Sequence, residues 1–192
     1  MPLAEAIIRL AVAVLWVAWL IYWGSSARDV KPTRRTEPLK SQLLHRIPLI
    51  LGVICLAAPR WVPLGLTRRV LPRGNGFLLL GAVLVAAGLA FAVWARRHLG
   101  RNWSSHVVLK QDHALVRSGP YQRVRHPIYT GILLALLGTA ITIGELRAAV
   151  GFALFLVSFV LKSRTEERWM REVFPEYEQY RQGTAALIPK VY

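Results

Sequence analysis

Long apolar stretches constrain the fold of this chain more than any other feature. A helix needs about 20 mostly apolar residues to cross a hydrocarbon core of about 30 Å. Five stretches reach or approach this length, at residues 3–23, 43–58, 77–95, 127–144 and 148–161. The second and fifth are short, so their helices should include flanking interfacial residues. The sequence therefore predicts an all-α membrane protein with about five transmembrane helices.

Composition and length indicate one integral membrane domain over residues 1–192. Hydrophobic residues make up 54% of the chain and the mean hydropathy is +0.37, whereas soluble domains are about 45–50% apolar. We expect three helices within residues 1–95 and the other two within residues 96–192. Cys55 is the only cysteine, so the chain cannot form an intrachain disulfide.

Lys and Arg in the loops predict the orientation, because cytoplasmic loops of membrane proteins are enriched in both. The first loop, the third loop and the tail after residue 161 are basic and lie on one side of a five-helix arrangement, so we expect this side to be cytoplasmic. The second loop disagrees, since it contains Arg60, Arg68, Arg69 and Arg73. The net charge of +15 comes largely from residues that flank helices and meet anionic headgroups. We therefore expect membrane lipids, and not nucleic acid, as partners.

The N-terminus allows a second interpretation. Residues 10–23 precede Gly24-Ser25-Ser26-Ala27, as the apolar region of a signal peptide precedes a small-residue cleavage site. A signal peptide carries positive charge before its apolar region, whereas here the basic cluster follows it. This order favours an uncleaved helix with its N-terminus outside the cytoplasm.

A polar block before the fourth apolar stretch is the strongest candidate for a functional site. Residues 119–131 read Gly-Pro-Tyr-Gln-Arg-Val-Arg-His-Pro-Ile-Tyr-Thr-Gly. Arg and His at the mouth of a membrane helix are costly unless they hold something polar. The fourth and fifth stretches are separated by little more than Glu145 and Arg147, which predicts a tight helical hairpin. The hairpin should bring the block beside Glu166 and Glu167 in the tail.

The histidine pattern argues against a metal site. His98, His106 and His113 are eight and seven residues apart, whereas a zinc-binding helix places its two histidines four residues apart. The sequence also lacks the glycine-rich loops that bind nucleotide phosphates and the Cys-x-x-Cys pair. We therefore predict no metal site.

Residues 96–192 contain an ordered set of short motifs. They are Leu99-Gly100-Arg101-Asn102-Trp103-Ser104, His113-Ala114-Leu115-Val116, Gly119-x-Tyr121, Arg125-His126-Pro127-x-Tyr129-x-Gly131, Arg164-x-Glu166-Glu167, Tyr177-x-x-Tyr180 and Ile188-Pro189. Their order resembles that of the isoprenylcysteine carboxyl methyltransferases, in their bacterial or archaeal form. Each motif alone is weak, but the ordered set is specific. The first 95 residues resemble the family only in having three apolar spans.

The resemblance implies an enzyme that transfers a methyl group from S-adenosylmethionine to a lipophilic carboxylate and leaves S-adenosylhomocysteine. It implies a cytoplasmic cofactor pocket formed by the loop before the fourth helix and by the tail. The implied cofactor contacts are His113, Ala114, Leu115, Val116, Gly119, Tyr121, Arg125, His126, Pro127, Ile128, Tyr129 and one of the pair Glu166 and Glu167. The implied catalytic residues are Glu167 and Arg164, and Arg164 would bind the anionic group of the acceptor. A carboxylate is already nucleophilic, so we name no general base.

The resemblance leaves other functions open. Similar membrane enzymes methylate phospholipid amines or small thiols, and sterol reductases with similar C-terminal halves reduce enones with NADPH. A non-enzymatic membrane scaffold is a further alternative. Arg far outnumbers Lys, as in proteins from GC-rich bacterial genomes, so we expect a bacterial inner membrane with the active site facing the cytoplasm.

Overall fold

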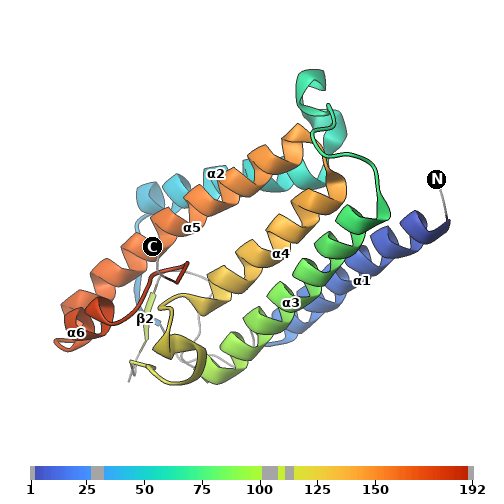
Figure 1. Cartoon of the computed structure of the whole chain (residues 1–192). Helices are drawn as coiled ribbons and strands as arrows, with labels where there is room; N and C mark the ends of the chain where they lie inside the picture. Colours follow the sequence, from blue (N-terminus) through green and yellow to red (C-terminus); the bar gives the residue numbers. More distant parts are fainter. Residues whose placement is uncertain (1–2, 27–32, 101–107, 111–114, 190–192) are drawn as a thin grey trace.

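The computed structural model describes residues 3–26, 33–100, 108–110 and 115–189. Its long helices are α1 (Leu3–Ser26), α2 (Leu39–Ala57), α3 (Asn75–Leu99), α4 (Pro127–Ile143) and α5 (Leu146–Val173) (Figure 1). α1, α2, α3 and α5 are long and apolar enough to cross a membrane, and α4 is a shorter apolar helix of 17 residues. The predicted all-α membrane fold is confirmed.

α5 extends well beyond its apolar stretch. The apolar pattern predicts an end near residue 161, but α5 has 28 residues and continues to Val173. Hydropathy marks only the part of a helix that meets lipid, and most residues that follow are good helix formers such as Lys, Arg, Glu and Met. About three further turns therefore project past the apolar region. These turns carry Glu166 and Glu167.

α3 and α4 make the most extensive helix contact of the bundle, and glycines line it. A Cβ atom on Gly88 would lie 2.5 Å from both the Ala135 nitrogen and the Gly131 oxygen. A Cβ atom on Gly138 would lie 2.4 Å from the Gly81 oxygen. Residues without side chains let membrane helices approach closely. α2 packs along α5, and α1 packs along α3.

The first and third loops meet at the end of the bundle that carries the short helix α6 (Tyr177–Gln182), which we call the α6 end. There β1 (Thr33–Thr36) pairs antiparallel with β2 (Val108–Lys110). The Arg96 guanidinium also donates to the Ser26 carbonyl over 2.6 Å. These contacts agree with the predicted placement of both loops on one side. The two-stranded sheet itself was not predicted from the sequence.

The opposite end holds the α4–α5 turn and the loop between α2 and α3, which forms the 3-10 helices η1 (Pro59–Trp61) and η2 (Leu64–Leu66). Arg147 is buried, pairs with Glu145 over 2.6 Å and donates to the Cys55 carbonyl over 2.7 Å. It thereby satisfies a carbonyl near the C-terminus of α2, where helical partners run out. The predicted tight hairpin of α4 and α5 is confirmed.

The glycine contact between α3 and α4 makes a testable prediction. Gly88→Ala should lower the free energy of unfolding by about 1–3 kcal/mol, because the added methyl group overlaps backbone atoms of α4. Gly76→Ala is the matched control in the same helix, since a Cβ atom there meets nothing within 4 Å. Thermal unfolding in detergent micelles measures both. Equal stability of the two variants would contradict the close approach of α3 and α4.

Candidate functional site

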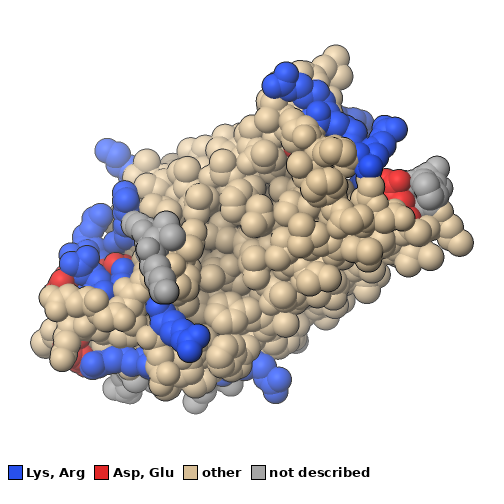
Figure 2. All heavy atoms as spheres, in the orientation of Figure 1, with Lys and Arg blue, Asp and Glu red and all other residues tan. Residues whose placement is uncertain are grey.

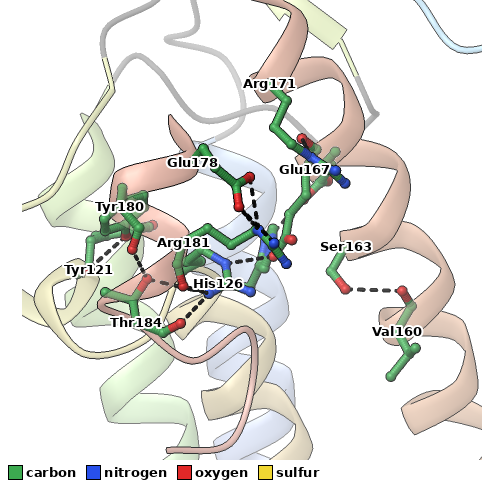
Figure 3. A network of polar contacts seen from close by, with 12 residues as sticks. Tyr121, His126, Val160, Ser163, Glu167, Arg171, Glu178, Tyr180, Arg181 and Thr184 are labelled. Carbon is green, nitrogen blue, oxygen red and sulfur yellow. Dashed lines mark hydrogen bonds and ion pairs between the residues drawn. The ribbon is translucent and has the colours of Figure 1, made fainter. Parts of the chain in front are cut away.

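A cluster of ion pairs joins the start of α4, the projecting turns of α5 and the tail at the α6 end (Figure 3). Arg125 and His126 come from the block before α4, and Glu166 and Glu167 come from α5. Arg125 and Glu167 are 42 positions apart in the sequence. The α4–α5 hairpin brings the two ends of this segment together.

Arg125 ties three segments to one another. Its Nε donates to Glu167 Oε1 over 2.7 Å. Its Nη1 donates to the Arg181 carbonyl over 3.1 Å and also to the Thr184 carbonyl. The side chains of both Arg125 and Glu167 are buried, at 8% and 10% exposure. A buried charge is tolerated when it is paired and hydrogen-bonded, and both conditions hold here.

His126 lies between the two glutamates. Its Nε2 is 3.2 Å from Glu167 Oε1, and its Nδ1 is 3.3 Å from Glu166 Oε2. Burial alone would lower the pKa of His126, but the hydrogen bonds and negative charges of both carboxylates outweigh burial and raise this pKa above its ordinary value. Charged imidazole donates from both ring nitrogens, which suits a position between two carboxylates.

Tyr129 adds an aromatic face beside these charges. Its hydroxyl donates to Glu166 Oε1 over 2.6 Å. Its ring stacks on His126 with centroids 5.5 Å apart and on Phe159 with centroids 4.8 Å apart. The Lys162 Nζ lies 5.4 Å from the centre of the same ring, within the range of a cation–π contact. This corner of the site therefore already accommodates a positive charge over an aromatic ring.

The tail is held against the start of α4 by backbone hydrogen bonds. The Arg125 amide donates to the Ala185 carbonyl over 2.9 Å, and the His126 amide donates to the Ala186 carbonyl over 3.0 Å. The Thr130 hydroxyl donates to the Leu187 carbonyl over 2.6 Å. The start of α4 therefore presents the charged side chains and also fixes the tail beside them.

Three tyrosines pack around this cluster. The Tyr180 hydroxyl donates to the Tyr121 carbonyl over 2.6 Å, and the Tyr121 hydroxyl lies 3.4 Å from the Ala95 carbonyl. Burial raises the pKa of Tyr180 to about 12 and raises the pKa values of Tyr121 and Tyr177 further. These hydroxyls therefore keep their protons at neutral pH, and those of Tyr180 and Tyr121 donate hydrogen bonds.

The structure places the predicted site residues in three settings. Arg125, His126, Tyr129, Glu166 and Glu167 share direct contacts. Others are at least partly buried in the surrounding packing, and these are Leu115, Val116, Gly119, Tyr121, Pro127 and Ile128. Arg164 lies on an exposed face of α5, and His113 and Ala114 fall outside the described residues. Among the described residues, no group of His, Cys, Asp and Glu side chains could hold a metal ion.

Two charged residues near the site were not singled out from the sequence. Lys162 follows the fifth apolar stretch directly, and this position could have identified it. Glu37 is buried before α2 and its Oε2 lies 2.9 Å from Nε2 of the buried His45. Glu37 lies within electrostatic reach of both Tyr129 and Lys162. No local motif marks Glu37, because only the packing of α2 on α5 brings it near the site.

Known proteins are similar to the part of this chain that contains the charge cluster. The family model described as phospholipid methyltransferase matches residues 77–177. The protein-S-isoprenylcysteine O-methyltransferase of Schizosaccharomyces pombe is 35% identical over 60% of this chain and 48% of its own length. The cobalt-zinc-cadmium resistance protein CzcN of Cupriavidus metallidurans is 34% identical over 48% of this chain and 44% of its own length. The chain thus spans about half the length of these relatives. The motif resemblance to isoprenylcysteine carboxyl methyltransferases is confirmed.

The buried ion pairs predict that Glu167 is important for stability. Glu167→Ala should lower the free energy of unfolding by about 3 kcal/mol, because Arg125 and His126 lose a buried partner. Glu178→Ala is the matched control, since the Glu178–Arg181 pair is exposed and exposed pairs contribute little. Thermal unfolding in detergent measures both. Equal losses in the two variants would contradict the structural role of the cluster.

The raised pKa of His126 predicts a pH dependence. The unfolded-state pKa is about 6.5 and the folded-state value is higher, so the stabilisation is complete below pH 6.5 and declines as the pH rises through the folded-state value. The stability difference between the wild type and His126→Gln should therefore shrink over this range. Unfolding measured at a series of pH values tests this. A difference that grows with pH would contradict it.

Proposed function

Because the chain belongs to the phospholipid methyltransferase family, we propose that it transfers a methyl group from S-adenosylmethionine to a lipophilic acceptor at the membrane. The main support is the cluster that joins Arg125, His126 and Tyr129 to Glu166 and Glu167, all within the segment that matches the family. We place the protein in a bacterial inner membrane with the α6 end in the cytoplasm, as the basic loops at that end favour. The product of the cofactor would be S-adenosylhomocysteine.

The chemistry of the cluster fits this cofactor, which has an ammonium, a carboxylate, an adenine and a sulfonium. Glu166 or Glu167 would hold the ammonium by a charge-assisted hydrogen bond. His126 or Arg125 would hold the carboxylate. The Tyr129 ring is already stacked on His126 and Phe159, so the sulfonium charge would be held by backbone oxygens or by another aromatic face near the site. When bound, the cofactor supplies an electrophilic methyl group on sulfur.

These residues would act by positioning. Methyl transfer is an in-line displacement, so the nucleophile and the methyl group must be held in line. Arg125 and His126 keep both glutamates in fixed orientations, which prepares the site before the cofactor binds. Arg164 is our candidate to hold the anionic group of the acceptor. The predicted cofactor contacts in residues 113–121 would complete the site from the third loop.

We propose a lipophilic carboxylate, such as an isoprenylcysteine, as the acceptor. Relatives from Schizosaccharomyces pombe and other organisms are named for O-methylation of isoprenylcysteine proteins. A carboxylate is ionised at neutral pH, so no side chain has to remove a proton before attack. This matches a cluster in which each carboxylate is already engaged by Arg, His or Tyr.

A phospholipid amine is the second candidate acceptor. The description of the matching family favours it, and so does the buried Glu37–His45 pair. An ammonium acceptor must lose a proton before its nitrogen can attack, and a carboxylate–imidazole pair is a suitable proton acceptor. Small-thiol methylation, NADPH-dependent reduction and a scaffold role are the remaining alternatives.

Cofactor binding tests the proposal. Purified protein in nanodiscs should bind S-adenosylmethionine and not NADPH in calorimetry. Of Glu166→Gln and Glu167→Gln, the variant that removes the ammonium contact should weaken this binding about 10-fold to 100-fold, as expected for the loss of a hydrogen bond to a charged group. Glu178→Gln is the control and should bind normally.

Radiolabelled methyl transfer in the same nanodiscs distinguishes the acceptors, with a prenylcysteine analogue in one arm and phosphatidylethanolamine in the other. Label in a base-labile ester indicates a carboxylate acceptor, and base-stable label in the phospholipid indicates an amine. Binding of NADPH alone would overturn the proposal in favour of a reductase. Binding of neither cofactor would favour a scaffold.

A further inference from the structure

We propose that the loop between α2 and α3, residues 58–74, binds anionic phospholipid headgroups at the end of the bundle opposite the site. The loop contains four arginines and no acidic residue. All four are exposed, namely Arg60, Arg68, Arg69 and Arg73. Figure 2 shows a group of basic side chains at this end, well separated from the basic side chains at the α6 end. We call residues 58–74 the arginine loop.

The arginine loop also presents large apolar side chains. Trp61 is 83% exposed and Leu64 is 88% exposed. An indole ring is favoured at the membrane interface, where its apolar body meets lipid and its N–H meets water. Because the loop connects the ends of two helices that are long and apolar enough to span the membrane, these side chains stand at the level of the headgroups.

The rest of the loop is fixed to the bundle. The Val70 amide donates to the Gly144 carbonyl over 2.9 Å, and the Leu146 amide donates to the Arg68 carbonyl over 3.0 Å. Val62 is buried. Arg69 donates to the Ile143 carbonyl over 3.2 Å and so stabilises the α4–α5 turn. The loop is therefore a fixed platform whose outward side chains are prepared to bind.

Charge and chemistry together select the ligand. Arg binds phosphate through two parallel N–H groups, which makes it well suited to a phosphodiester. A zwitterionic lipid would provide apolar contacts for Trp61 and Leu64. It would, however, leave the charges of Arg60, Arg68 and Arg73 beside headgroups with no net charge. An anionic lipid such as phosphatidylglycerol satisfies both kinds of side chain. This role also accounts for the conflict between this loop and the positive-inside rule, because these arginines bind lipid instead of reporting orientation.

Fluorescence quenching by spin-labelled lipids tests the proposal with Trp61 as the reporter. The Trp61 signal is the difference between the wild type and Trp61→Phe in liposomes. Headgroup-labelled phosphatidylglycerol should quench this signal several-fold more than labelled phosphatidylcholine at the same mole fraction, since each arginine strengthens binding to an anionic surface on the order of fivefold. The triple variant Arg60→Gln, Arg68→Gln, Arg73→Gln should remove the preference.

A matched triple variant controls for the loss of overall charge. Lys40→Gln, Arg97→Gln, Arg168→Gln removes three exposed charges outside the arginine loop and should keep the preference of Trp61 for phosphatidylglycerol. Equal quenching by the two lipids in the wild type would overturn the proposal, whether or not the variants fold. An equal loss of preference in both triple variants would also overturn it. The experiment measures no methyl transfer, so its result is independent of the proposed enzymatic function.

Discussion

The rest of the structure depends on the pairing of Glu167 with Arg125 and His126. Charges of this kind are costly to bury alone, so the fold must bring all partners to one place. The α4–α5 hairpin does this for the two sides of the cluster, and the extra turns of α5 carry the glutamates past the apolar region to meet it. The tail then closes over the pair through the backbone of residues 185–187. The length of α5, the α4–α5 turn and the position of the tail thus all bring the charged partners of Glu167 together.

The five helices and the meeting of the two polar segments could be predicted from the sequence, because apolar length and hairpin geometry are local properties. The extension of α5 could not be predicted in this way, because hydropathy marks only the part of the helix that meets lipid, and α5 continues beyond that part. The pairing of β1 with β2 and of Glu37 with His45 leaves no local pattern either. The β1–β2 pairing depends on how the first loop meets the distant third loop, and Glu37 reaches its partner His45, eight residues along the chain, only in the folded start of α2. For the site, the sequence identified the residue types, but the hydrogen-bond partners of Arg125 in the tail required the structure.

The segment that matches the family and the rest of the chain contain different parts of the site. Residues 77–177 contain the whole charge cluster, while α1 and α2 lie outside the match and pack on the outer sides of α3 and α5. Substitutions in α1 and α2 can therefore change the lipid-facing walls without disturbing Arg125 or the glutamates. A family that keeps one cofactor chemistry and varies its acceptors would vary in these two helices first.

The glycine contact of α3 with α4 and the anchoring of Arg147 to α2 have a mechanical consequence. α3 and α4 touch through their backbones, and α2 packs along α5. These two helix pairs are joined at the α4–α5 turn, where Arg147 of α5 donates to the Cys55 carbonyl of α2. α4 is 17 residues long, or about 25 Å, so a change of about 5° in its tilt at this turn would displace its other end by about 2 Å. The charge cluster lies at that other end, so its distances depend on how firmly Arg147 and the glycine contact fix the tilt of α4.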